Sequence, residues 1–236
     1  MKKLAILVLA CLSYGCATLS EEECRTVDWY DLGFADGQSG YKSRANSHSE
    51  NCGKYGVRPD LNQYREGYQS GLDVYCTYEN GVRIGQMAGV YQNVCVGGAR
   101  QEFYEGYLPY YNVANTQKRV SAERRSIIDS EKKLKEKDLS SKDRSSTEYY
   151  LGQKKSNFRK LRMDLLRYEY ELSVHVIDRE IKEISDDLKN GNITGVERQD
   201  RLKRVRELQK LRRSETNNYK MKKTAMSIKE IKDMFD

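Results

Sequence analysis

The stretch Tyr30-Asp31-Leu32-Gly33-Phe34-Ala35-Asp36-Gly37 carries the pattern on which we base the fold of the first half of the chain. An aromatic residue stands three positions before a glycine, and a second glycine stands four positions after it. The pattern returns at 64–71 and 78–85, and in part at 103–107. At about 100° per residue, all of its positions fall on one narrow face of a helix.

Glycine costs about 1 kcal/mol relative to alanine inside a helix, so its repeated use needs a packing reason. We therefore predict short helices that pack closely through glycine and aromatic side chains. The charged and amide residues between the glycines exclude the membrane setting in which such pairing is familiar. An alternative interpretation is an aromatic surface for a ligand such as a glycan. Asp28, Asp60 and Thr77 are the predicted N-caps of three of these helices.

Four cysteines lie in the same block: Cys24, Cys52, Cys76 and Cys95. We predict that all four form disulfides. Four cysteines allow three connectivities, and an up-and-down arrangement of the helices favours Cys24–Cys76 together with Cys52–Cys95. A zinc site is disfavoured because the sequence contains no Cys-x-x-Cys pair.

The N-terminus has the pattern of a secretory signal peptide. Met1-Lys2-Lys3 precedes an apolar run from Leu4 to Leu12, which is shorter than the ~20 residues of a membrane-spanning helix. Leu12-Ser13-Tyr14-Gly15-Cys16 follows and resembles a lipobox, the site at which a bacterial lipoprotein is cleaved and its new N-terminal cysteine receives lipid.

We predict a signal peptide over residues 1–15, lipidation of Cys16 and a tether over residues 16–27. Cleavage before Cys16 leaves four downstream cysteines, an even number that suits an oxidising periplasm, whereas cleavage before Cys11 leaves five. Ala17, rather than aspartate, follows the cysteine. By resemblance to enterobacterial lipoproteins, this predicts sorting to the outer membrane, with the protein facing the periplasm.

The second half of the chain has a different charge. Residues 1–115 carry 10 Lys/Arg and 13 Asp/Glu, whereas residues 116–236 carry 32 and 22. We predict a disulfide-bridged helical domain over residues 28–112 and a basic coiled-coil hairpin over residues 113–236. The basic side chains have two interpretations, a solvated helix face or a contact with anionic headgroups, lipopolysaccharide or an acidic partner.

Apolar residues in the second half recur every three or four positions, as in the seam of a coiled coil. The runs are Phe158, Leu161, Leu165, Tyr168 and Leu172; Val174, Ile177, Ile181, Ile184 and Leu188; and Leu202, Val205, Leu208 and Leu211. Gly191 suits the end of the first long helix, and Thr194-x-x-Glu197 is a capping box for its return. An upstream helix near residues 120–134 adds a third helix to the bundle.

Several short motifs resemble a known family. They are Cys16–Cys24, Asp28-Trp29-Tyr30, Gly33-Phe34-x-Asp36-Gly37, Tyr75-Cys76-Thr77, Gly89-x-Tyr91-x-x-x-Cys95 and Phe103-x-x-Gly106-Tyr107. Over residues 16–111 the chain resembles uncharacterised proteobacterial lipoproteins that are catalogued as a domain of unknown function. The resemblance implies a secreted, lipidated and cysteine-bridged domain, and it supplies no activity. Ser13 and Tyr14 depart from the family's usual cleavage site.

The sequence does not favour an enzyme. The two histidines, His48 and His175, have no nucleophile pattern beside them, and no phosphate loop or His-Glu-x-x-His motif occurs. We predict an all-α, non-enzymatic envelope lipoprotein without a catalytic site, cofactor, metal or nucleic-acid partner. It would be held in the membrane by the lipid on Cys16 and would meet an envelope protein through residues 116–236. The alternative is a binding module for peptidoglycan glycan or lipopolysaccharide.

Overall fold

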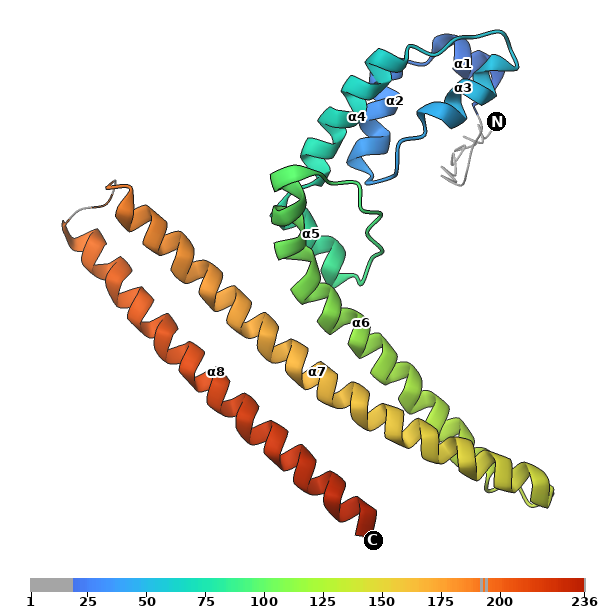
Figure 1. The fold of residues 1–236 in the computed structure, drawn as a ribbon, viewed down its shortest axis with the longest axis vertical. Coiled ribbons are helices and arrows are strands. Elements are labelled where there is room, and N and C mark those ends of the chain that lie inside the picture. The colour runs from blue at the N-terminus through green and yellow to red at the C-terminus, as the bar shows by residue number, and fades with distance from the viewer. Residues whose placement is uncertain (1–18, 192, 194, 236) are drawn as a thin grey trace, which may run out of the picture. The chain divides into compact units, whose positions relative to one another are not determined.

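The computed structural model describes residues 19–191, 193 and 195–235, with side chains to residue 228, and within them the protein is all-α (Figure 1). The predicted signal peptide, Cys16 and Thr194 lie outside the described residues. The chain forms two units, residues 19–76 with 92–96, and residues 77–91 with 97–235. The helices of the first unit are α1 (Glu21–Thr26), α2 (Trp29–Gln38), α3 (Ala45–Gly53) and α4 (Leu61–Tyr75). The second unit contains α5 (Tyr78–Gln86), α6 (Gly97–Lys133), α7 (Ser141–Lys189) and α8 (Gly195–Phe235).

The predicted N-caps of three short helices are confirmed. The Asp28 side chain accepts hydrogen bonds from the backbone amides at the start of α2, and the Asp60 side chain does the same for α4. Thr77 accepts from the amide of Asn80 at the start of α5. These side chains satisfy backbone donors that have no partner within the helix, so they fix where each helix begins.

The glycine faces of α2 and α4 pack directly against each other. A Cβ added to Gly33 would overlap the carbonyl oxygen of Tyr64, and one added to Gly67 would overlap that of Tyr30. One turn further on, Gly37 and Gly71 lie in the same way against backbone of the opposite helix. Because the residue numbers in contact rise together, the two helices run parallel. The predicted packing through glycine is confirmed.

A second parallel pair is formed by α5 and α6. Gly81 lies against the carbonyl of Phe103, Gly106 against that of Tyr78, and Gly85 against that of Tyr107. The fourth copy of the pattern has Tyr110 where the second glycine would stand, and its Cβ contacts Gly85. The partial repeat in the sequence is therefore a complete member of a helix pair.

Equivalent hydrogen bonds are found in the two helix pairs, each from a tyrosine of the second helix to the segment that follows the first helix. In the first pair the Tyr68 hydroxyl donates to the carbonyl of Tyr41, and in the second the Tyr107 hydroxyl donates to that of Gly89. The segments after α2 and α5 also match, since each turns through a left-handed residue, Gly40 or Ala88. The two pairs are thus copies of one structural repeat.

The disulfides are Cys24–Cys52 and Cys76–Cys95, so all four predicted cysteines are bridged but the expected pairing was wrong. The expectation assumed helices that run up and down. In a parallel pair, both helices begin at the same end. Cys24 precedes α2 and Cys52 precedes α4, and Cys76 and Cys95 likewise precede α5 and α6. Each bridge therefore joins the segments that enter the two helices of one pair.

The expected boundary near residue 113 is not a break in the structure. Helix α6 runs without interruption from Gly97 to Lys133, and the change in charge falls inside it. The first part of α6 packs on α5 and its later part packs on α7. Helices α5 and α6 therefore belong to the same unit as the long hairpin, rather than to the unit that contains α1 to α4.

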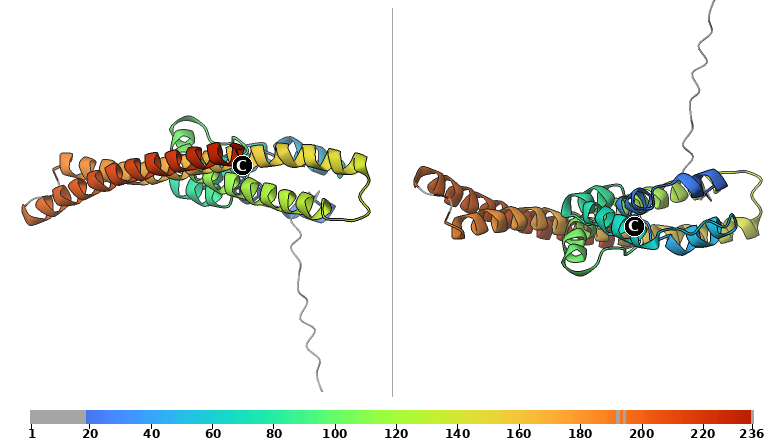
Figure 2. Two further views of the ribbon diagram at one scale, coloured as in Figure 1. Left: turned by 90° about the horizontal axis from the view of Figure 1, so that it is seen from below. Right: turned by 90° about the horizontal axis from the view of Figure 1, so that it is seen from above.

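The long helices α7 and α8 form the predicted hairpin (Figures 1 and 2). Its core consists of Ile177, Ile184 and Leu208, with Ile181, Leu188 and Val205 packed around them. Leu202 and Leu211 are exposed, so only part of the expected seam on α8 is buried. Gly191 has the left-handed conformation expected after α7. None of the described helices has the combination of length and apolar composition needed to cross a membrane.

We predict that Gly67→Ala strongly destabilises the first unit, because the added methyl group would overlap the backbone of Tyr30 and force α2 and α4 apart. The expected loss is about 3 kcal/mol or more in the free energy of unfolding. Chemical denaturation followed by circular dichroism measures it. Gly53→Ala is the matched control, since nothing lies within 4 Å of the Cβ that it adds. Equal effects of the two substitutions would contradict close packing at Gly67.

Candidate functional site

The first unit contains a buried polar cluster around Asp36. This residue lies on α2, and its side chain is 1% exposed. The Tyr64 hydroxyl donates to the carboxylate at 2.7 Å, Arg44 donates from both Nε (3.1 Å) and its terminal nitrogen, and the Nε2 atom of His48 lies 3.4 Å away. The cluster thus joins α2 and α4 to the crossover between them, which contains α3.

The cluster keeps Asp36 ionised. Burial is the largest single influence and raises the pKa of Asp36. The hydrogen bonds from His48, Arg44 and Tyr64 outweigh it and lower the pKa from 3.8 to about 2. Burial and the hydrogen bond to Asp36 raise the pKa of Tyr64, so the phenol keeps its proton. The Asp36 carboxylate therefore accepts hydrogen bonds from three side chains, and these bonds fix the crossover to α2 and α4.

The second helix pair has no counterpart of this cluster. Ile84 occupies the place of Asp36 on α5, and Phe103 occupies the place of Tyr64 on α6. There the crossover is held by an aromatic cluster, in which the buried Tyr91 ring lies 4.5 Å from that of Phe103 and 5.8 Å from that of Tyr107. The crossover is therefore held around a buried carboxylate in one copy, whereas contacts between aromatic rings hold it in the other.

A cleft of about 380 Å³ lies in the second unit and contains His175. Its lining residues are charged or ionisable: Glu105, His175, Asp178, Arg179, Lys182 and Glu183. Beside it, the guanidinium of Arg179 stacks on the Tyr78 ring, 3.4 Å from its centre, and the His175 imidazole lies 6.3 Å from the same ring. Burial, and then Arg179, lower the pKa of His175. Among the described residues, no partner accepts from or donates to its buried Nε2 atom.

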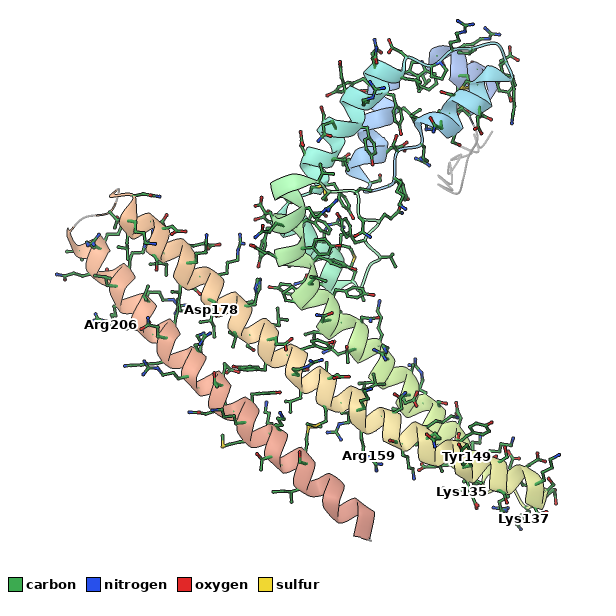
Figure 3. The ribbon with its side chains drawn as sticks, in the orientation of Figure 1. Lys135, Lys137, Tyr149, Arg159, Asp178 and Arg206 are labelled. Atoms are coloured by element: carbon green, nitrogen blue, oxygen red, sulfur yellow. A yellow bond between two sulfur atoms is a disulfide. The ribbon has the colours of Figure 1, made fainter. Side chains whose placement is uncertain are left out.

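Three arginines of α8 form ion pairs with acidic residues of α7. Arg201 bonds Asp187 at 3.0 Å, Arg204 bonds Glu180 at 2.8 Å, and Arg212 bonds Asp178 at 2.6 Å (Asp178 is labelled in Figure 3). These are exposed pairs, and because solvent screens the charges, they contribute little to stability. They link α8 to α7 and account for three of the basic residues of the predicted hairpin.

The two histidines are in different environments, His48 in the buried cluster and His175 in the cleft. Asp36, Arg44 and Tyr64 were not recognised from the sequence as members of a site. A signal was present for Asp36, because it lies with Trp29, Gly33 and Gly37 on the buried face of α2. An acidic residue at such a position needs partners. No group of three His, Cys, Asp or Glu residues in the described chain has the geometry of a metal site.

Residues 28–109 match the model of a family described as "Protein of unknown function (DUF2799)". The match covers less than half of the chain. It spans α2 to α5 and the beginning of α6, and hence both glycine-packed pairs, while α7 and α8 lie outside it. No curated protein and no solved structure matches the chain. The family supports the predicted relationship to an uncharacterised domain, and its description names no activity.

The Asp36 cluster predicts a specific pH dependence of stability. A carboxylate whose pKa is lowered on folding stabilises the fold above its unfolded pKa, and this contribution is lost as the pH falls toward the folded value. From 3.8 to about 2, the shift corresponds to about 2 kcal/mol. The free-energy difference between wild type and Asp36→Asn, measured by urea unfolding, should therefore shrink between about pH 4 and pH 2. Asp31→Asn, on the exposed side of α2, controls for the loss of an acidic side chain. A difference that stays constant with pH would contradict the assignment.

Proposed function

We propose that the protein is a non-enzymatic lipoprotein of the bacterial cell envelope, anchored in the outer membrane through lipid on Cys16 and facing the periplasm. The observation that carries this proposal is the pairing of the cysteines. Cys24, Cys52, Cys76 and Cys95 are all consumed in two bridges, which leaves Cys16 for the lipid once the signal peptide is removed. Disulfides of this kind belong to oxidising compartments such as the periplasm.

We further propose that the second unit contacts an envelope protein. Tyr149 and Tyr150, near the N-terminal end of α7, are 65% and 59% exposed and pack edge-to-face on each other (Tyr149 is labelled in Figure 3). Tyrosine is enriched among the residues that dominate protein interfaces. These two adjacent exposed rings on α7 are therefore the partner site that we favour.

Glycan binding by the tyrosine-rich block has less support. The side chains of Tyr64, Tyr75, Tyr91 and Tyr107 are buried and serve the packing of the helix pairs. A glycan surface in this block would have to use other tyrosines, such as Tyr30 and Tyr41.

The anchor is tested by the intact mass of the mature protein purified from the membrane fraction. We expect a chain that begins at Cys16, carries the mass of the lipid, and gains on reduction the hydrogens of two disulfides. Cys16→Ser should abolish the lipid, and Cys11→Ser should leave it in place. Lipid that persists in the Cys16→Ser protein, or a mature chain without lipid, would refute the proposed anchor.

The partner site is tested by photo-crosslinking in cells. A photoreactive residue in place of Tyr150 should give a defined adduct that excess wild-type protein competes away, because the ring is exposed at the proposed interface. Lys160, also exposed on α7, is the control position and should give no such adduct. The site would be wrong if both positions were labelled equally, or if neither were.

A further inference from the structure

The basic residues of α8 between positions 201 and 213 form two sets. Arg201, Arg204 and Arg212 face α7 and pair with its acidic side chains. A second set is exposed, and the described part of the chain provides no ion pair for any of its members. We call this set the outer stripe; it consists of Lys203, Arg206, Lys210 and Arg213. Arg206 is labelled in Figure 3.

The outer stripe is continuous along the helix. Its residues follow one another at intervals of three and four, so they fall within roughly 80° of the helix circumference and extend over about 15 Å of its axis. They lie on the side opposite Leu208, which is buried against α7. The stripe borders a shallow groove of about 290 Å³, whose lining includes Gln209 and one acidic residue, Glu207.

We propose that the outer stripe binds the phosphate groups of an anionic membrane surface. This inference deepens the proposed function and depends on it for the presence of a membrane near the protein. Four ammonium and guanidinium groups offer only hydrogen-bond donors and positive charge, which is the chemistry that phosphate recognises. Clusters of four to eight Lys or Arg beside a bilayer are attracted to anionic headgroups, and each contributes to the affinity.

The composition of this face favours a membrane over a protein partner. Between residues 199 and 217, the positions on the arc of the outer stripe are Gln199, Lys203, Arg206, Lys210, Arg213 and Asn217. None is apolar or aromatic. Protein interfaces draw most of their affinity from aromatic residues and arginines that are buried in well-packed pockets. The arc offers Arg206 and Arg213 but no apolar or aromatic residue that could be buried beside them, whereas headgroup binding requires only charge. Nucleic acid presents the same phosphate chemistry, and the experiment separates it from lipid.

The test uses the full mature chain with Cys16→Ser, so that the lipid anchor does not decide the result. Flotation is measured with phosphatidylcholine vesicles that contain or lack phosphatidylglycerol. We expect binding only to the vesicles with phosphatidylglycerol, and its loss in high salt. Changing Lys203, Arg206, Lys210 and Arg213 together to Gln should weaken this binding tenfold or more. Glutamine keeps the helix propensity, and circular dichroism verifies the fold.

The matched control removes the same charge elsewhere. Lys132, Lys133, Lys135 and Lys137 are exposed at the end of α6 and in the turn that follows, and their replacement by Gln should leave vesicle binding unchanged. An equal loss in both variants would show an effect of net charge and overturn the proposal, as would unchanged binding of the stripe variant. Binding to a duplex oligonucleotide that depends on the stripe, without binding to vesicles, would overturn it in favour of nucleic acid.

The vesicle assay and the test of the lipid anchor can fail independently of each other. The vesicle assay contains no lipidated protein, so a mature chain without lipid on Cys16 would refute the anchor while stripe-dependent vesicle binding stood. If the wild-type protein is lipidated but its Cys16→Ser form does not bind phosphatidylglycerol vesicles, the proposed anchor stands and membrane binding by the outer stripe is refuted.

Discussion

In each helix pair, backbone lies against backbone where glycine removes the side chain. The carbonyl of Tyr30 rests on Gly67 and that of Tyr64 rests on Gly33, and the second pair repeats the arrangement with Tyr78, Gly106 and Phe103. Small residues allow this approach, and van der Waals contact then acts between the two backbones. The contact is reciprocal, so a side chain added on either helix would separate both.

Parallel packing imposes the rest of the repeat. Two parallel helices that follow each other in the chain need a segment that returns to the starting end, and such a segment has little hydrophobic core of its own. This returning segment is the crossover of each pair, and a disulfide, Cys24–Cys52 or Cys76–Cys95, fixes it at that end. It is then held along the pair by the Asp36 cluster in the first copy and by the Tyr91 cluster in the second. Different side chains thus meet the same geometric requirement in the two copies.

The sequence allowed prediction of the glycine face, the N-caps and the hairpin, because each depends on residues close together in the chain. Helix direction could not be read in this way. The pattern around Gly33 marks one face of a helix, and that face is the same whether its partner runs parallel or antiparallel, so the disulfide pairing that depended on direction was wrong. The boundary near residue 113 failed for a related reason. A change in charge reflects exposure to solvent, whereas α6 serves two partners in succession, first α5 and then α7.

In the hairpin, only a few residues form the core, so much of the surface of α8 takes no part in packing. Its cohesion comes mainly from Ile177, Ile184 and Leu208, because exposed ion pairs such as Arg212–Asp178 contribute little to the free energy of folding. They pair the arginines of α8 that face α7. The cations on the opposite face contribute neither core nor pairing, and like charges at intervals of three and four slightly oppose helix formation. The outer stripe therefore has no role in folding. Binding to an external anion is a role that would explain why four cations lie there.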